Sequence, residues 1–366
     1  MSKNILLIGK YPPVQGGVAA KTYWLYEQLK VKGYNIRTVT TEIENYSILE
    51  EHEDKDVHLV KLKKIPWHIP YSELIYDRLL NICLEAVNEF TPDIIETNYL
   101  WPFCSVAANI SNHLKKPLLI RHAGSDIAKF RSDPEFIEII RNYLNRANKV
   151  VTNSTSNDFI NELCKDKNRI ELMQRYIPDP QVFNDKKINK KYDILLAGKI
   201  NFYWQHKGID ILLSLISAKK LKALFIIDGN YMEDLNEKIK KENLDENIEI
   251  IKFVHPKEMP KFINQCKSVW CWEDEAAIED FSNLIWEACF CNVKCILNSD
   301  RRISLEMEYL KENFPALIEM YNKEEILKLQ MEDFKNNQGK GVSEMNNIYT
   351  SYVDQNIALY NSLLNT

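Results

Sequence analysis

Twice along the chain, a short apolar segment is followed by a loop and then by a segment with helical spacing. The first copy starts at Asn4 and continues to about Lys32, and the second starts at Tyr192 and continues to about Ile216. A buried strand joined to a helix is the unit from which parallel sheets are built, because parallel strands need a long crossover connection. Two such starts predict two α/β domains, each with a mainly parallel sheet.

The length of the chain fits the same division, since 366 residues are many for a single hydrophobic core. Residues 176–191 are rich in Pro, Lys and Asn and lack periodicity, which is typical of a linker. We expect an N-terminal domain at 1–180, a C-terminal domain at 192–345 and a final helix at 346–366.

Composition excludes several classes of protein. Hydrophobic residues make up 45% and charged residues 27%, as in an ordinary globular protein rather than a disordered one. The net charge of −5 gives no basic excess for binding nucleic acid. The first apolar run is interrupted by Lys10 and Pro12, so it is too short for a signal peptide or a membrane span. These features predict a cytoplasmic protein.

The eight cysteines are scattered, mostly within apolar runs, and form no CxxC pair. We interpret them as reduced core residues. The cluster of Cys289, Cys291 and Cys295 leaves a metal site as an alternative, which the lack of a nearby His disfavours.

The pattern of segment 270–298 predicts a strand, an acidic loop, a helix and a strand. Its acids Glu279 and Glu287 are eight positions apart and bracket the start of the helix. Ser282 or Asn283 is a suitable N-cap, so we expect the amides of residues 283–285 to be unsatisfied at the positive end of the helix. Such a helix start can bind a phosphate.

The two acids suit separate tasks. Glu279, in the loop, can accept hydrogen bonds from sugar hydroxyls, and Glu287, inside the helix, can hold a vicinal ribose diol. Sugar, diphosphate and ribose are the parts of a nucleotide sugar. The alternative is an acidic surface loop followed by an ordinary amphipathic helix.

This segment resembles the E-x7-E motif of retaining GT-B glycosyltransferases of the large family 4 group. Asn292, Val293 and Lys294 occupy the place of the family's Gly-x-Pro, and Asn tolerates the left-handed geometry that such a turn requires. The residues that match the motif are Glu279, Ser282, Asn283, Leu284, Glu287 and Ala288.

The loop after the first strand leads to Gly16 and Gly17 at a helix start. No G-x-G-x-x-G follows the strand, which disfavours a nicotinamide or flavin site. The two glycines allow a substrate to approach backbone amides, although a plain turn is the alternative. The sequence YPPVQGGV is similar to the Pro-Pro-x-x-Gly-Gly-Val loop of the same glycosyltransferases, which faces the interdomain cleft in that family.

Polar residues also follow two later strands of the first domain. Asn98 and Tyr99 come after the strand at 93–96, and His122 comes after the strand at 117–121. The carboxyl ends of parallel strands form the edge at which open α/β folds bind ligands. The resemblance places His122 beside the donor sugar, whereas the extra Ala123 leaves the role of Asp126 open.

In the second domain, Lys199 and Lys207 flank the loop after the strand that begins at Tyr192. Two cations there can neutralise a diphosphate. The glycosyltransferases commonly have an Arg and a Lys in these places. The alternative is a pair of solvated lysines.

Residues 61–71, KLKKIPWHIPY, combine lysines with apolar side chains. This composition suits contact with an anionic membrane surface, and many of the glycosyltransferases use lipid-linked acceptors. A packed loop is the alternative. Contact with lipid would place the protein at the inner face of the membrane.

The resemblance implies a GT-B fold, with two Rossmann-like domains, an interdomain cleft and a last helix that crosses back to the first domain. It implies a retaining, metal-independent glycosyltransferase of the hexosyltransferase type, with no cofactor besides its nucleotide-sugar co-substrate. The acceptor would be a glycan, a lipid-linked or another small molecule in polysaccharide or glycoconjugate synthesis. The implied catalytic residues are His122, Glu279 and Lys207, the donor-binding residues are Gly17, Lys199, Lys207, Ser282, Asn283, Leu284 and Glu287, and the acceptor-side residues are Gly16, Asn98 and Tyr99.

Two other functions compete with this interpretation. A protein that kept the fold and lost transfer would bind nucleotide as a scaffold, and the altered loop at 201–206 and the Pro178-Asp179-Pro180 segment fit that alternative. A sugar phosphorylase or a nucleotide-sugar epimerase would use the same fold.

Overall fold

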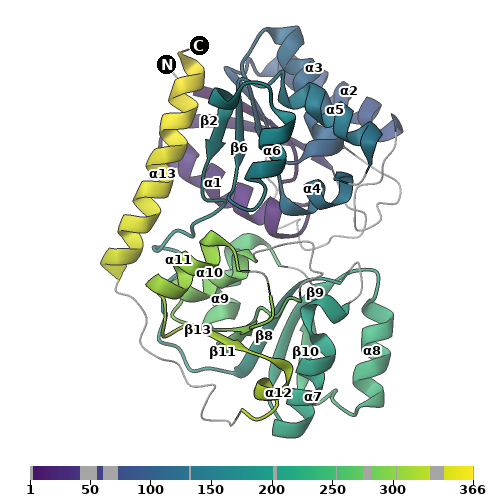
Figure 1. The fold of residues 1–366 in the computed structure, drawn as a ribbon, viewed down its shortest axis with the longest axis vertical. Coiled ribbons are helices and arrows are strands. Elements are labelled where there is room, and N and C mark those ends of the chain that lie inside the picture. Colours follow the sequence, from purple (N-terminus) through teal and green to yellow (C-terminus); the bar gives the residue numbers. More distant parts are fainter. Residues whose placement is uncertain are drawn as a thin grey trace. The chain divides into compact units, whose positions relative to one another are not determined.

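A computed structural model describes residues 3–41, 56–60, 73–131, 133–200, 204–252, 254–274, 282–301, 303–329 and 342–365. The chain divides into two compact units, which are coloured along the sequence in Figure 1. Unit 1 comprises Met1–Tyr176 and Thr350–Thr366, and unit 2 comprises Ile177–Tyr349.

Unit 1 is built on a seven-stranded sheet in which all neighbouring strands are parallel. The inner strand β1 is buried on both faces, because Ile5 to Ile8 are all inaccessible to solvent. This pattern is typical of a parallel sheet covered by helices on each side. In spatial order, the strands are β3 (Val57–Val60), β2 (Tyr34–Thr41), β1 (Lys3–Ile8), β4 (Ile94–Thr97), β5 (Leu118–Arg121), β6 (Lys149–Thr152) and β7 (Ile170–Leu172).

The helices of unit 1 bury one apolar side each against the sheet. Helix α2 contributes Ile75, Leu79 and Cys83 to a core shared with β1, β4, β5 and β6. Helix α5 begins where Asp133 accepts hydrogen bonds from the amides of residues 135 and 136, which is an N-cap that its sequence favours. The helices are α1 (Gly17–Val31), α2 (Glu73–Glu89), α3 (Ser105–Leu114), α4 (Gly124–Phe130), α5 (Pro134–Leu144) and α6 (Asn157–Leu163), with a π-helical turn at Leu100–Cys104 before α3.

Unit 2 contains a six-stranded sheet whose neighbouring strands are also all parallel. In spatial order, its strands are β10 (Ile248–Ile251), β9 (Ala223–Asp228), β8 (Tyr192–Lys199), β11 (Cys266–Trp270), β12 (Lys294–Asn298) and β13 (Ile318–Tyr321). Its helices are α7 (Ile209–Lys219), α8 (Met232–Lys241), α9 (Met259–Asn264), α10 (Asn283–Phe290), α11 (Leu305–Asn313) and α12 (Lys323–Ile326). The predicted α/β class, with one parallel sheet in each half, is therefore confirmed.

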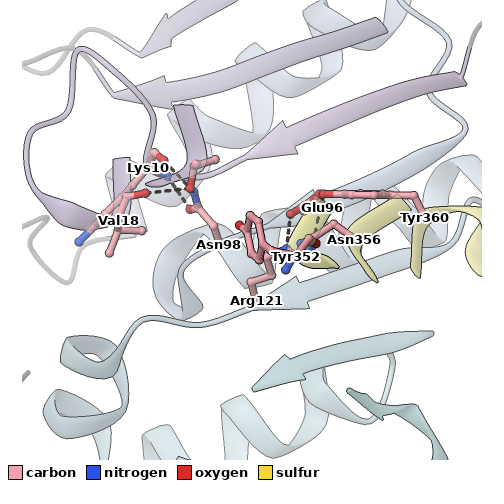
Figure 2. Close-up of polar contacts among 9 residues, drawn as sticks. Lys10, Val18, Glu96, Asn98, Arg121, Tyr352, Asn356 and Tyr360 are labelled. Carbon is pink, nitrogen blue, oxygen red and sulfur yellow. Dashed lines mark hydrogen bonds and ion pairs between the residues drawn. The ribbon is translucent and has the colours of Figure 1, made fainter. Parts of the chain in front are cut away.

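The last helix, α13 (Val342–Leu364), packs on the sheet of unit 1 from Thr350 onward. A buried polar network joins the two elements (Figure 2). Arg121 Nε, at the end of β5, donates to Glu96 Oε1, at the end of β4, over 2.8 Å. The Tyr360 hydroxyl donates to the other oxygen of Glu96 over 2.7 Å, and Arg121 Nη2 donates to Asn356 Oδ1 over 2.8 Å.

The hydrogen bonds of this network offset the cost of removing the charges of Glu96 and Arg121 from water. Glu96 is inaccessible to solvent, so its carboxylate depends on Arg121 and Tyr360 for the hydrogen bonds that water would supply. Burial, followed by the charge of Glu96, raises the pKa of Tyr360 well above its ordinary value, so the hydroxyl stays a donor. The C-terminal helix is therefore part of the polar core of unit 1.

We predict a graded loss of stability when this network is altered. Glu96→Gln leaves the buried guanidinium of Arg121 without its counter-charge and should lower the free energy of unfolding by about 3 kcal/mol. Tyr360→Phe removes one hydrogen bond to a carboxylate and should cost about 1.5 kcal/mol. Asp354→Asn, at an exposed position of the same helix, is the matched control and should change stability by less than about 0.5 kcal/mol. Urea denaturation measures all three, and a Glu96→Gln protein as stable as the control would contradict the role of the ion pair.

Candidate functional site

The carboxyl edge of the unit 1 sheet brings the loop after β1 against the end of β4. Asn98 Oδ1 accepts a hydrogen bond from the Lys10 amide over 2.8 Å, and its Nδ2 donates to the Lys10 carbonyl over 2.7 Å. The same Nδ2 donates to Thr22 Oγ1 in α1 over 2.7 Å. Figure 2 shows these bonds around Asn98. Both amide hydrogens of Asn98 are thus donated within the chain, and the side chain positions the loop.

Gly9 is required for this arrangement. A Cβ at Gly9 would lie 2.3 Å from Asn98 Oδ1, which is closer than real Cβ contacts allow. Tyr99, the second residue predicted here, is buried, and Lys10 Nζ lies 3.4 Å from the centroid of its ring. This cation–π contact holds the lysine over the edge of the sheet. The acceptor-side role of Asn98 and Tyr99 remains a prediction.

The predicted glycine turn forms the start of α1. Gly16 is the N-cap, with a φ of 107° that side-chain-bearing residues rarely adopt. Gly17 is the first helical residue and is exposed. Among the described residues, no side chain caps this helix start. Binding by Gly16 and Gly17 remains a prediction.

His122 lies directly after β5 and is only 4% exposed. Its Nε2 lies 2.9 Å from Thr152 Oγ1 at the end of β6, and its Nδ1 makes no hydrogen bond of normal geometry among the described residues. Burial, followed by the positive charges of Arg175 and Lys21, lowers the pKa of His122 to about 3, although the backbone of Ala123 acts in the opposite direction. The ring is therefore neutral at physiological pH.

Asp126 has a structural explanation that the sequence left open. Its Oδ2 accepts from the amides of Ala123 and Leu100, each over 3.0 Å, and its Oδ1 accepts from Ile127 over 2.8 Å. The carboxylate thereby ties the turn that carries His122 to the turn after β4. Burial raises the pKa of Asp126 to about 6, and the hydrogen bonds from Ala123 and Leu100 oppose that rise.

A pocket opens beside His122 within unit 1. Several of its lining residues follow strands β6 and β7 or lie in helices, and sequence reasoning did not identify them. Thr152 and Asn153 could have been predicted from the sequence, because polar residues at the carboxyl end of a neighbouring parallel strand lie at the same edge of the sheet. The lining includes Lys21, His122, Thr152, Asn153, Arg175 and Tyr352.

In unit 2, the structure brings Lys207 to the strand end that carries Lys199. Lys207 Nζ lies 3.5 Å from the position that a Cβ of Gly198 would take, so it stands next to the backbone that precedes Lys199. The two lysines are therefore neighbours at the carboxyl end of β8. Their contact with a diphosphate remains a prediction.

Two tryptophans fix the loop that carries Lys207. Trp270 Nε1 donates to the Lys207 carbonyl over 2.7 Å, and the rings of Trp270 and Trp272 stack with centroids 5.1 Å apart. Gly208 has a φ of 58°, and a Cβ there would lie 2.4 Å from Trp272 Cδ1. Only glycine fits between the loop and the indole, so the Lys-Gly pair is a requirement of local packing.

The start of α10 differs in one respect from the prediction. Ser282 is the N-cap, as expected, but it satisfies two of the amides expected to be open. Its Oγ accepts from Leu284 over 3.4 Å, and its carbonyl accepts from Ile285 over 3.1 Å. The expectation that these two amides are unsatisfied was wrong, because the N-cap residue itself bonds them. Phosphate binding by Ser282, Asn283 and Leu284 remains a prediction.

Of the two acids of the motif, the structure describes only Glu287. Glu287 lies in α10 and is only 5% exposed, whereas Glu279 lies outside the described residues. The described part of the loop is held by a buried ion pair, with Arg301 Nη2 at 3.3 Å from Glu273 Oε2. Asn298 Nδ2 donates to the Glu273 carbonyl over 3.3 Å. The loop after β11 is thus anchored at its first residues.

The remaining predictions concern cysteines, metals and membranes. All eight cysteines are free and buried, in agreement with core positions. Within the described residues, no group of three or more His, Cys, Asp and Glu side chains could hold a metal ion. Of the helices in that part of the chain, none is long and apolar enough to cross a membrane. The stretch at 61–71 and residues 201–203 lie outside the described residues.

No protein-family model matches this sequence, and no curated protein matches it either. Solved structures do match the fold. Sucrose-phosphate synthase from Thermosynechococcus elongatus superposes with a TM-score of 0.71 at 14% identity, over 99% of each chain. A mutant of TarM from S. aureus, in complex with fondaparinux, alpha-GlcNAc-glycerol and UDP, gives 0.68 at 12% identity over 100% of each chain.

The chain has the GT-B fold. The same fold similarity extends to UDP-GlcNAc 2-epimerase from Methanocaldococcus jannaschii, with a TM-score of 0.55 at 16% identity over 96% of this chain and 100% of that one. One fold hosts many activities, so the activity of this protein depends on the residues at the two sheet edges.

The neutral, buried state of His122 predicts a specific pH dependence of stability. An unfolded chain protonates this histidine below about pH 6.5, whereas the folded chain does not until about pH 3. The free energy of unfolding should therefore fall as the pH decreases between these values, by about 1.4 kcal/mol per pH unit from this group.

His122→Gln removes this contribution, so wild type should lose about 2 kcal/mol more than the variant between pH 7 and pH 5. The opposite effect of Asp126 is present in both proteins and cancels. His113→Gln, at an exposed position of α3, is the control and should follow wild type. Urea midpoints at several pH values provide the measurement, and parallel pH profiles of wild type and His122→Gln would contradict a depressed pKa.

Proposed function

We propose that this protein is a retaining glycosyltransferase that moves a sugar from a nucleotide-sugar donor to an acceptor. The observation that carries the proposal is the likeness to transferases over essentially the whole chain, combined with two neighbouring lysines at the carboxyl end of β8. TarM was solved with UDP, so we propose UDP as the nucleotide. The donor sugar is proposed to be a hexose.

The residues of unit 2 suit the leaving group. When the glycosidic bond to the donor breaks, negative charge develops on the diphosphate, and preorganised cations stabilise that charge. Lys207 is held by Gly208 and the tryptophan pair, so little reorganisation is needed during the reaction. Lys199, Ser282, Asn283 and Leu284 are proposed to bind the same phosphates, and Glu287 the ribose. Glu279 is proposed to position the sugar.

The residues of unit 1 suit the other groups. Gly17 is proposed to bind the donor through its backbone, and His122 to contact a sugar hydroxyl as a neutral hydrogen-bonding group. Its low pKa means that protonation should not remove this role at physiological pH. Gly16, Asn98 and Tyr99 are proposed to lie on the acceptor side, where Asn98 acts by positioning the loop rather than by direct contact.

In this proposal the nucleotide leaves and the acceptor enters from the same face of the sugar, so no protein nucleophile is needed. The acceptor is proposed to be a glycan, a lipid-linked or another small molecule in cell-surface polysaccharide or glycoconjugate synthesis. Metal independence and a cytoplasmic location, at the membrane face if residues 61–71 bind lipid, belong to the same proposal.

An epimerase acting on a nucleotide sugar is the second candidate, and the fold similarity to UDP-GlcNAc 2-epimerase favours it. The two functions share a donor site and differ in the fate of the bound sugar. A transferase needs an acceptor and releases the nucleotide, whereas an epimerase changes the sugar without any acceptor. The TM-score is lower for the epimerase, 0.55 against 0.71 for the synthase, so we rank the transferase first.

Nucleotide binding tests the shared donor site through Glu287. Replacing this buried acid by glutamine removes a charge-assisted hydrogen bond to the ribose, so UDP should bind at least about tenfold more weakly. Glu312→Gln, at an exposed position of α11, is the matched control and should bind UDP like wild type. Isothermal titration with UDP, GDP and ADP measures the affinities.

Two results would count against the proposal in different ways. Equal affinity of wild type and Glu287→Gln for UDP would remove this acid from the donor site. The absence of binding of any of the three nucleotides to wild type would contradict nucleotide-sugar chemistry altogether.

A further inference from the structure

Two loops at the carboxyl edge of the unit 2 sheet are joined by a histidine and an aspartate. Strands β8 and β11 are parallel neighbours in this sheet. His206 follows the first of them and Asp274 follows the second. His206 Nδ1 lies 3.2 Å from Asp274 Oδ1, and the Asp274 amide donates to the His206 carbonyl over 3.1 Å. The pair thus links the two loops through both the side chains and the main chain.

The contact with Asp274 determines what the imidazole of His206 can bind. A carboxylate only accepts hydrogen bonds, so in the neutral ring the proton lies on Nδ1 and Nε2 is an acceptor. A carboxylate beside an imidazole holds it in one tautomer and one orientation. His206 makes no second side-chain hydrogen bond among the described residues, and its side chain is 33% exposed. Its Nε2 can therefore accept a hydrogen bond from a hydroxyl group of a ligand.

The position of the pair agrees with the donor site proposed above. Lys207, which is proposed to bind the diphosphate, directly follows His206 in the same 3₁₀ turn, Trp204–Lys207. Asp274 directly precedes the segment that contains Glu279, which is proposed to position the sugar. In a nucleotide sugar, the sugar is bonded to the diphosphate. A side chain next to the phosphate-binding lysine is therefore suited to contact the hydroxyls of the sugar.

We propose that His206, oriented by Asp274, accepts a hydrogen bond from a hydroxyl of the donor sugar and contributes to the choice of donor. The inference rests on the proposed function and adds a specificity-determining residue to its donor site. A site that bonds a hydroxyl discriminates against a sugar that lacks it, because the polar group of the protein is then left unpaired. Asp274 is a positioning residue, since it acts on the sugar only through the ring.

Other contacts hold the Lys207 loop without the imidazole. Trp270 Nε1 donates to the Lys207 carbonyl over 2.7 Å. The main-chain bond from Asp274 to the His206 carbonyl does not depend on the side chain at position 206. A substitution of His206 should therefore leave the loop and its phosphate contacts in place.

Affinities for UDP and for a UDP-hexose separate a sugar contact from a phosphate contact. Isothermal titration of the full chain with UDP-glucose, UDP-galactose and UDP-GlcNAc first identifies the donor that wild type binds most tightly. His206→Phe keeps a planar ring and removes the acceptor, so this donor should bind about fivefold more weakly, with the affinity for UDP unchanged. His206→Gln offers an amide oxygen near the position of Nε2 and should restore most of the affinity.

Asp274→Asn tests the positioning role. The new amide can donate to Nδ1, which moves the ring proton to Nε2 and removes the acceptor. This variant should weaken binding of the UDP-hexose but not of UDP. Asp245→Asn makes the same change of charge at an exposed position of unit 2, and it should bind both ligands like wild type. Circular dichroism and the melting temperature verify that each variant is folded.

The possible failures of the inference and of the proposed function are distinguishable. Equal weakening of UDP and the UDP-hexose by His206→Phe would assign the ring to the phosphates or to the loop. Unchanged affinity for both would leave the pair as a link between loops, and binding of UDP without any UDP-hexose would exclude a sugar contact. Each of these results overturns the inference alone. If neither UDP nor any UDP-hexose binds wild type, the proposed function fails as well.

Discussion

The organisation of unit 1 depends on the buried ion pair between Glu96 and Arg121. The pair joins the ends of two neighbouring strands, and its remaining hydrogen bonds come from Tyr360 and Asn356, more than 200 positions later in the chain. Because a buried carboxylate cannot be left without partners, the sheet edge and the C-terminal helix have to assemble together. Arg121 and Tyr352 also line the pocket beside His122, so the same constraint shapes this pocket.

The two sheets use a common device at their carboxyl edges. In each, a glycine allows a loop to pack against a large or polar side chain, Gly9 against Asn98 and Gly208 against Trp272. The loops that carry the candidate ligand groups are therefore fixed by contacts beneath them, so the charged side chains can be held in place before a ligand arrives. Preorganisation of this kind is what electrostatic stabilisation of a leaving diphosphate requires.

Local signals in the sequence predicted much of this architecture. The strands at residues 93–96 and 117–121 and the cap at Ser282 follow from apolar runs and capping chemistry, and the structure confirms them to within one residue. The short strands β7 and β13 and the helix α4 were not predicted, because only neighbours in the sheet make such short segments regular. Tertiary packing brings Arg121 into contact with Tyr360. It also brings the charges of Lys21 and Arg175 close to His122. The periodicity of the sequence cannot predict such contacts between distant segments.

The most direct measurement is a proton NMR time course of the full chain with a panel of UDP-sugars, with and without phosphorylated and neutral acceptors. We predict that UDP is released together with a glycoside whose anomeric configuration matches that of the donor, and that the release of UDP requires an acceptor. Conversion of the donor sugar into its epimer without release of UDP, or a product of inverted configuration, would contradict it.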